Sequence, residues 1–531
     1  MKFDIIVENG FIIDGTGNPF FKADVGVADG KMVEIGALSS HSAEVRIDAE
    51  GLIVAPGFID IHTHSDFTLL VNPRAESSVR QGVTTAVIGN CGHSCAPVSE
   101  ETKGLLKKII IGYSPTVEID WHTLGEYLNR LEEGGIAQNV APLVGHGAVR
   151  IAAMGFEDRA PKRDELERMK LLVAEAMEDG AFGLSSGLGY PPGSYATTEE
   201  MIELCRVVAN YGGFYATHVR TYGEPGRLEA VKEAIRIGVE AGVPVQISHH
   251  TASAKAEETL PLIDEARAQG LDVTCDLHPY LWAATTVTVL LPKKTLKEGV
   301  DALLERLREP EERRRILEEI DLESLHPYLD SWDKVVLERS DGNPELVGKS
   351  FTEIAETLGM SPKEVVAYLL LNSKDPYNVY VLLHHYTEED VIKVLRHPTS
   401  MVETDGMALA PYGQLASIRF HPRSYGSFPR VLRRFVREKR VITLEEAVRK
   451  MTSLPAQRLG LRDRGLLREG MWADMVIFDA ERVTDRATYE EPTLYPEGIE
   501  YVIVNGTVVV EGGNHTGALP GMVLRRGARR V

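Results

Sequence analysis

The sequence predicts an α/β protein built on a closed (β/α)8 barrel of the TIM type, with a small β-sandwich domain made from both termini and a helical insertion. Through the middle of the chain, apolar strand-like runs alternate with amphipathic helical stretches. Both ends contain short apolar runs separated by turns, and a charged helical stretch interrupts the alternation late in the middle. From these three observations we expect a sandwich formed by 1–55 and 462–531, a barrel over 56–461 and an insertion at 292–341.

The two ends of the chain have the same β-rich texture. Asn-Gly, Gly-Thr-Gly-Asn and Asp-Gly turns separate the runs near the start, and Asn-Gly recurs at 505–506. The expected strands are Lys2–Val7, Gly10–Ile13, Ala23–Ala28, Lys31–Ile35, Met475–Phe478, Tyr501–Val504 and Thr507–Glu511. Because the ends match each other and differ from the middle, we expect them to form one domain; a separate domain at each end is the alternative.

The middle of the chain predicts a parallel sheet covered by helices, because its strands are almost continuously apolar. The expected strands are Gly57–His62, Thr84–Ile88, Asn139–Val144, Phe182–Ser185, Gly213–His218, Val243–Ser248, Asp272–Asp276, Val379–Leu383 and Thr399–Glu403, with helices such as Arg163–Asp179, Thr198–Asn210 and Arg227–Ala241 between them. Roughly eight such units favour a closed barrel over an open doubly wound sheet, the alternative. In the insertion, Glu305–Glu319 is dense in Arg and Glu, which is typical of a solvated helix face.

Composition excludes several classes of protein. The chain has 531 residues, of which 43% are hydrophobic, so it can bury a large core and is not disordered. Its net charge of −20 argues against nucleic acid as a partner. It has no apolar run long enough to span a membrane, no signal peptide, and four cysteines that form no disulfide framework. We expect a soluble cytoplasmic protein; its oligomeric state stays open.

The most informative motif runs from Pro56 to His64 and reads Pro-Gly-Phe-Ile-Asp-Ile-His-Thr-His. His62 and His64 lie two apart on an extended chain, so their imidazoles project from the same face. They stand where an apolar strand ends, and barrels build their active sites at the carboxyl ends of strands. Two neutral imidazoles converging there predict a metal site suited to zinc.

Four later strands end in the same kind of residue. The apolar runs lead into Cys91, His218, the pair His249-His250, and Asp405. Three or four histidines, a thiolate and a carboxylate can hold two divalent metals. Neighbouring strand residues point to opposite faces, so only one of His249 and His250 can face the mouth of the barrel.

These residues resemble the metal-dependent amidohydrolase superfamily. Gly-Asn-Cys-Gly at 89–92, Ser-Ser-Gly-Leu-Gly-Tyr-Pro-Pro-Gly at 185–193, Ile-Ser-His-His at 247–250 and His-Pro-Arg at 421–423 make the chain similar to the N-acyl-D-amino acid deacylases (D-aminoacylases) within it. The resemblance covers nearly the whole chain. Many superfamily members bridge two metals with a carboxylated lysine on the fourth strand, but the stretch 180–190 has no lysine. The D-aminoacylase-like subgroup uses a cysteine instead, which corresponds to Cys91.

The resemblance also implies how the metals are held. It assigns one tightly bound zinc to Cys91, His218 and His249. It assigns a second, weaker site to His62, His64, Cys91 and Asp405. A thiolate between two cations stays deprotonated because the cations lower its pKa. Asp405 would then act as general base, taking the proton of a metal-bound water as hydroxide attacks the amide carbon, and would return that proton to the departing nitrogen.

For the substrate, the resemblance implies a small N-acyl amino acid. Arg423 corresponds to the arginine that binds its carboxylate, Tyr280 to the partner tyrosine, and Tyr190 to a residue of the pocket. The chain departs from the family at Thr251, where a lysine is common. We therefore expect a zinc-dependent hydrolase of N-acyl-D-amino acids. Cyclic-amide hydrolysis of the hydantoinase or dihydroorotase kind, a dipeptidase acting on a C-terminal D-residue, and a metal-free scaffold are the alternatives.

Overall fold

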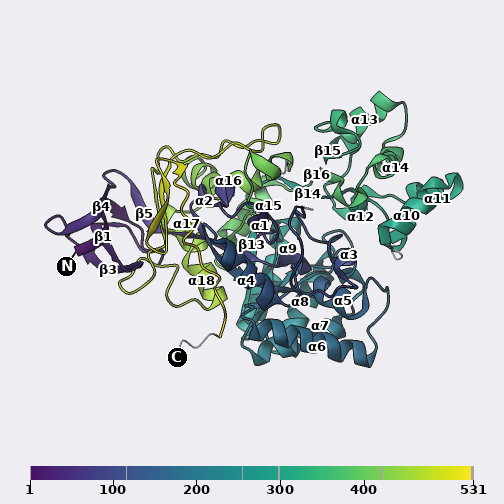
Figure 1. Cartoon of the computed structure of the whole chain (residues 1–531). Coiled ribbons are helices and arrows are strands. Elements are labelled where there is room, and N and C mark those ends of the chain that lie inside the picture. The colour runs from purple at the N-terminus through teal and green to yellow at the C-terminus, as the bar shows by residue number, and fades with distance from the viewer. Residues whose placement is uncertain (1, 115, 254, 297–298, 419–420, 528–531) are drawn as a thin grey trace.

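The computed structural model describes residues 2–114, 116–253, 255–296, 299–418 and 421–527. Three parts follow one another across Figure 1: the β-rich domain of the two termini, a central barrel, and an insertion that projects from the barrel. The described helices include none that combines the length and apolar character needed to cross a membrane.

The central barrel has eight strand positions, all joined by parallel pairing. In order they are β6 (Phe58–Asp60), β7 (Val83–Ile88), β8 (Asn139–Pro142) continued by β9 (Val144–Gly145), β10 (Gly183–Gly187), β11 (Phe214–His218), β12 (Val245–Ile247), β13 (Val273–Leu277) and β17 (Ser400–Val402). A parallel bridge between Thr63 and Gly406 closes the ring after β6 and β17. The closed barrel is therefore confirmed over the open sheet.

Helices cover the outside of the barrel. They are α4 (Leu124–Gly134), α5 (His146–Met154), α6 (Arg163–Glu178), α7 (Thr198–Asn210), α8 (Arg227–Ala241), α9 (Ala256–Ala268), α15 (Glu388–Arg396) and α17 (Leu444–Met451), with the short α1 (Thr68–Val71), α2 (Glu76–Val79) and α3 (Lys103–Leu106) between strands. Their ends follow local sequence signals: the Thr197 hydroxyl caps the start of α7, and Gly242 ends α8 in the left-handed conformation.

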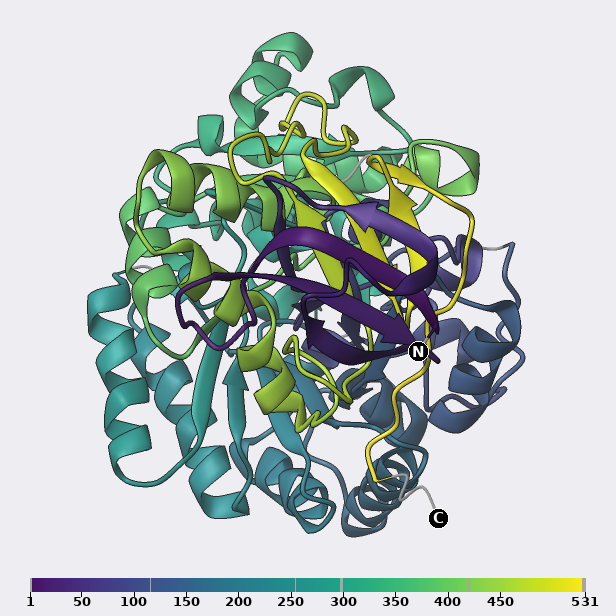
Figure 2. The ribbon, with the colours of Figure 1, turned by 90° about the vertical axis from the view of Figure 1, so that its left-hand side faces the viewer.

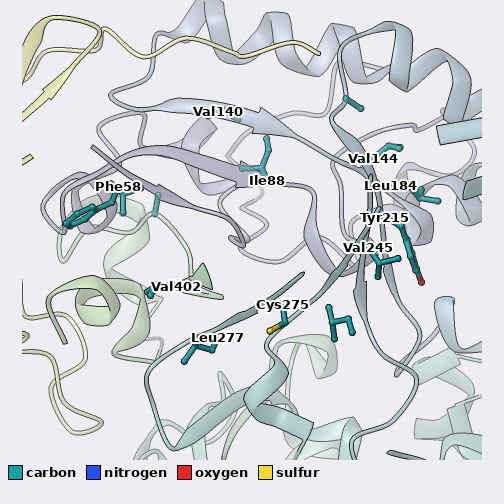
Figure 3. Close-up of a cluster of buried hydrophobic side chains, with 14 of the residues drawn as sticks. Phe58, Ile88, Val140, Val144, Leu184, Tyr215, Val245, Cys275, Leu277 and Val402 are labelled. Carbon is teal, nitrogen blue, oxygen red and sulfur yellow. The ribbon is translucent and has the colours of Figure 1, made fainter. Parts of the chain in front are cut away.

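Alternation along the barrel strands separates two apolar clusters. One set of side chains packs outward against the helices and includes Ile88 on β7, Leu184 on β10 and Val245 on β12. Figure 3 shows these three among other members of the set. The other set fills the barrel, where residues such as Phe182 and Phe214 pack with Leu454. Leu454 belongs to α18 (Ser453–Leu459). The barrel is thus a packed core whose free positions lie at the strand ends.

The terminal domain contains strands from both ends of the chain in one sheet. They are β1 (Lys2–Ile12), β2 (Phe21–Ala28), β3 (Lys31–Gly36), β4 (Ser42–Asp48), β5 (Ile53–Pro56), β18 (Met475–Phe478), β19 (Ile499–Val504), β20 (Thr507–Glu511) and β21 (Asn514–His515). β5 pairs antiparallel with β18, so the purple and yellow strands of Figure 2 lie side by side. The prediction of one domain from both ends is confirmed.

The insertion is larger than predicted. It holds β14 (Trp282–Thr286), β15 (Val335–Arg339) and β16 (Tyr380–His384) in an antiparallel sheet, with α10 (Gly299–Arg308), α11 (Pro310–Glu318), α12 (Leu322–Leu325), α13 (Phe351–Leu358) and α14 (Pro362–Asn372). These elements share their own buried cluster. We therefore assign the insertion to 282–384 rather than 292–341.

The prediction of Val379–Leu383 as a barrel strand is wrong. This run forms most of β16, which pairs antiparallel with β14 on one side and β15 on the other. Its apolar residues are buried in the core of the insertion. A central antiparallel strand under helices has the same continuous apolar pattern as a barrel strand, so the pattern could not separate the two.

We predict that Phe58→Ala destabilises the barrel. Phe58 is fully buried on the first barrel strand, and its ring stacks on Phe428 at 5.4 Å. The cavity left behind should lower the free energy of unfolding by about 3–5 kcal/mol. Urea unfolding followed by circular dichroism measures the loss, with Phe21→Ala as control because that ring is 45% exposed. Equal midpoints for the two variants would contradict the prediction.

Candidate metal centre

The candidate ligands gather at the carboxyl ends of the barrel strands. His62 and His64 follow β6, Cys91 follows β7, His218 ends β11, His249 follows β12 and Asp405 follows β17. Together they span most of the chain, yet the parallel barrel places all these strand ends at one mouth. The structure therefore brings together the six candidate ligands that the sequence singles out.

Donor atoms from four of these residues form a tight group. The Cys91 Sγ lies 3.2 Å from His62 Nε2 and 3.6 Å from His249 Nε2. Donor atoms of His62, Cys91, His249 and Asp405 all lie within 4.8 Å of one another. His218 Nδ1 is 3.1 Å from His249 Nε2, so it adjoins the group.

Asp405 contacts both candidate ligand histidines that follow the first barrel strand, and an arginine. Its Oδ1 lies 3.0 Å from His64 Nε2 and 3.6 Å from His62 Nε2. Its Oδ2 pairs with Arg423 Nη1 at 2.8 Å, and the Arg423 side chain is only 3% exposed. Asp405 thus stands between the imidazoles and the guanidinium.

The backbone around the site adopts conformations that L-residues rarely use. Cys91, His249 and Asp405 have φ values of 54°, 35° and 45°. Residues held in the left-handed region cost free energy and collect at functional sites. The strand before Cys91 turns at Gly89, where φ is 79° and an added Cβ would lie 2.1 Å from the Leu143 carbonyl oxygen. Only glycine fits that approach.

The electrostatics suit a cation. Burial raises the pKa of the Cys91 thiol well above its usual range, so a thiolate there needs a positive ion beside it. Burial lowers the pKa of His62 and His218 well below the usual value and that of His249 to about 4, which leaves neutral imidazoles. Burial opposes ionisation of Asp405, but Arg423 and the hydrogen bond with His64 outweigh it and hold its pKa well below the usual range.

This donor set fits zinc. Neutral imidazole nitrogens and a thiolate are ligands that zinc prefers, and a carboxylate completes such sites. Because the thiol is buried and the histidines are neutral, a divalent ion would supply the charge that the cluster lacks. The residues present therefore match the metal expected from the sequence.

Several buried polar side chains that were not predicted from the sequence contact the candidate ligands. The Tyr222 hydroxyl lies 2.8 Å from His249 Nδ1. Three buried carboxylates lie beside two of the candidate histidines: Asp60 and Glu403 beside His62, and Asp276 beside His249. Burial raises the pKa of Asp60 and of Asp276 to about 7 and that of Glu403 well above its usual range. Asp60 and Asp276 lie at strand ends, a signal that could have found them; Tyr222 lies in a loop with none.

The predicted substrate residues lie close to the ligands. Tyr190 is half-buried, its hydroxyl donates to the Cys91 carbonyl at 2.8 Å, and its ring lies 4.9 Å from that of His218. Tyr280 is buried, and its hydroxyl donates to the Pro422 carbonyl at 3.3 Å, next to Arg423. The tyrosine hydroxyl thus contacts the backbone that carries the arginine, at the start of α16 (Arg423–Arg430).

The adjacent histidines have different partners, although both lie beyond the end of β12 and His249 has a left-handed φ of 35°, so strand alternation does not separate them. His249 faces Cys91, whereas His250 Nε2 lies 3.0 Å from the Thr259 hydroxyl on α9. Thr251, at the position where the family commonly has lysine, is buried, and its hydroxyl has no hydrogen-bond partner among the described residues. Cys95, Cys205 and Cys275 are free and buried.

Comparisons with known proteins find similarity over nearly the whole chain. The amidohydrolase family matches residues 46–317 and 413–510. D-aminoacylase from Alcaligenes xylosoxydans xylosoxydans is 38% identical, over 99% of this chain and 98% of the relative, and N-acyl-D-glutamate deacylase from the same organism is 36% identical over 99% and 97%. A similar solved structure is that of N-acyl-D-glutamate deacylase from Bordetella bronchiseptica, complexed with zinc and a phosphonate inhibitor that mimics the tetrahedral intermediate. It matches this chain with a TM-score of 0.83 and 35% sequence identity, over 99% of this chain and 100% of that one.

We predict that Cys91→Ala loses most of its zinc. Removing groups behind a metal ligand weakens binding about 10–100-fold, so removing a ligand itself should weaken it by more than about 100-fold. Metal content after gel filtration measures the change. Cys205→Ala is the matched control, since that thiol is equally buried but lies on helix α7. Full zinc retention in Cys91→Ala would contradict a thiolate ligand.

Proposed function

The chain belongs to the amidohydrolase family, and on that basis we propose that it hydrolyses N-acyl-D-amino acids to a carboxylate and a free D-amino acid. The observation that carries this proposal is the convergence of Cys91 with His62 and His249 at the mouth of the barrel. Relatives that align over nearly all of this chain are named D-aminoacylase and N-acyl-D-glutamate deacylase, and the N-acyl-D-glutamate deacylase from Bordetella bronchiseptica was crystallised with zinc.

The zinc ligands divide into two sets. Cys91, His218 and His249 would hold one ion tightly. His62, His64, Cys91 and Asp405 would form a second, weaker site that shares the thiolate. Zinc bound here supplies a Lewis acid that polarises the acyl oxygen and lowers the pKa of a water. The support for this division is the donor geometry, with Cys91 between His62 and His249.

Asp405 is the proton carrier in this proposal. Its carboxylate faces the ligand cluster and is kept ionised by Arg423 and His64. An ionised carboxylate can take a proton from the attacking water and return it to the nitrogen that leaves. The left-handed backbone at Asp405 directs its side chain to the space between the histidines and the arginine.

Arg423 would bind the carboxylate of the substrate. A guanidinium forms a bidentate fork for a carboxylate, and this one is buried, where the interaction is strengthened. Its present partner is Asp405. Because both anions would use the same guanidinium, Arg423 would fix the distance between the substrate carboxylate and the proton carrier. Tyr280 supports it through the Pro422 carbonyl, and Tyr190 lines the pocket beside His218.

The proposal is tested with a panel of N-acetyl and N-formyl D- and L-amino acids, hydantoins, dihydroorotate and dipeptides ending in a D-residue. We expect turnover of the N-acyl-D-amino acids and little of the rest. Hydrolysis of the cyclic amides alone would overturn the proposal. The absence of a lysine in β10 and the cysteine after β7 favour linear amides, by resemblance to the D-aminoacylases.

We predict that Asp405→Asn abolishes turnover while the tight zinc is retained. Loss of a general acid–base group typically costs about 10²–10⁴-fold in rate. The tight zinc should remain because its three ligands are unchanged. Asp264→Asn, on α9, is the control. Parallel measurement of kcat and zinc content distinguishes a lost proton carrier from a lost metal, and undiminished kcat would refute the role of Asp405.

We predict that Arg423→Ala raises KM and lowers kcat/KM chiefly for substrates with a free carboxylate. A charge-assisted hydrogen bond contributes about 1.5–3 kcal/mol, so the extra loss should be about 10–100-fold. The control is the matching N-acyl-D-amino acid amide, which lacks the carboxylate but still depends on Asp405. Equal losses of kcat/KM on the acid and the amide would mean that Arg423 acts only through its ion pair with Asp405 and does not bind the substrate carboxylate.

A further inference from the structure

Glu403 is the buried carboxylate closest to a ring nitrogen of His62. It directly follows β17, its side chain is fully buried, and neither of its oxygens has a hydrogen-bond partner among the described residues. His62 Nδ1 lies 3.4 Å from Glu403 Oε2. A buried polar group without a hydrogen-bond partner is costly, so this orientation calls for a specific role.

The two ring nitrogens of His62 face different surroundings. Nε2 lies 3.2 Å from Cys91 Sγ and 3.6 Å from Asp405 Oδ1, on the ligand side. Nδ1 faces Glu403, with Asp276 Oδ1 farther away at 3.9 Å. Nδ1 has no hydrogen-bond partner within normal limits among the described residues. A small rotation of either side chain would bring Nδ1 and Glu403 into hydrogen-bond distance.

The neighbouring carboxylates are already engaged. Asp276 accepts from the His249 backbone N–H at 2.5 Å and from Gln246 Nε2 at 2.6 Å. Asp60 accepts from the Thr404 hydroxyl at 2.6 Å and from the Thr404 backbone N–H at 3.1 Å. Of these three carboxylates, Glu403 is the one with oxygens still available to accept a hydrogen bond from the His62 side chain.

We propose that Glu403 is a positioning residue that accepts the Nδ1 proton of His62 and so keeps the Nε2 lone pair directed at the metal. Carboxylates commonly hold metal-binding imidazoles in this way: they fix the tautomer and orientation of the ring and increase its basicity. The inference rests on the proposed function only in taking His62 as a zinc ligand. Glu403 acts through His62, because the imidazole ring lies between it and Asp405.

The test compares Glu403→Leu, Glu403→Gln and the wild-type holoenzyme. Leucine has no hydrogen-bond acceptor. The side chain of glutamine has nearly the same volume as that of glutamate, and its carbonyl can still accept from His62 Nδ1. We expect Glu403→Leu to weaken binding at the second, His62-containing site about 10–100-fold, measured by competition with a chelator, and Glu403→Gln to recover part of the loss. The cobalt-substituted protein should show a changed visible spectrum in Glu403→Leu, since the position of a ligand has altered.

Glu338→Leu is the matched control, because Glu338 is also a buried glutamate but lies on β15 in the insertion. If Glu403→Leu fails to fold, Glu403→Gln alone carries the test through its weaker binding and altered cobalt spectrum. Unchanged affinity and spectrum in both variants would overturn the proposal. So would a loss of one metal equivalent at saturating zinc, since His62, Asp276 and Glu403 would then be ligands of an inner metal.

Failure of the proposed function gives a different result. If the wild-type enzyme hydrolyses none of the N-acyl-D-amino acids, the substrate assignment fails. The zinc affinity and cobalt spectrum of the Glu403 variants would still report on His62. Conversely, full activity on these substrates with unaltered metal binding in Glu403→Leu would reject the role of Glu403 alone.

Discussion

The closure of the barrel between β6 and β17 is the constraint on which the candidate site depends. At this seam the His62 carbonyl accepts from the Asp405 N–H at 3.0 Å, and His64 N–H donates to the Gly406 carbonyl at 2.7 Å. These bonds join residues more than 340 positions apart and place the carboxylate of Asp405 beside both histidines. Asp60, at the end of β6, also links the two strands, because its carboxylate accepts a hydrogen bond from the hydroxyl of Thr404, which follows β17. The ligand geometry is therefore fixed by the same backbone bonds that make the barrel a closed ring.

Burial explains why such a cluster needs a cation. A thiol, several imidazoles and four carboxylates share a region from which water is almost excluded. In that environment an unpaired charge is costly, so the thiol and most of the carboxylates are driven toward their neutral forms. A divalent ion reverses this preference for the groups that touch it. The buried polar cluster therefore needs the positive charge of a bound cation, which its side chains do not supply.

The sequence predicted the candidate ligands because each lies at the end of an apolar run, where a parallel barrel brings side chains together. Glu403 ends an expected strand, as Asp276 does, but Tyr222 lies in a loop without such a signal. The contacts of Glu403 with His62 and of Tyr222 with His249 could not be predicted, since they depend on side-chain packing between separate strands and loops. Val379–Leu383 was wrongly predicted as a barrel strand, because a fully buried strand has the same apolar sequence pattern in a parallel barrel and in the centre of the insertion sheet. The substrate residues beyond the strand ends came only from resemblance.

The insertion leaves and rejoins the barrel through neighbouring strands: Trp282 on β14 lies opposite His384 on β16, and Thr286 lies opposite Tyr380. Its departure and return points are therefore adjacent, as they are where one domain is accommodated inside another. With a separate core of its own, this unit can be enlarged, trimmed or exchanged during evolution without altering the pairing of the eight barrel strands. Related enzymes could in this way diversify what surrounds the mouth while keeping the same metal chemistry beneath it.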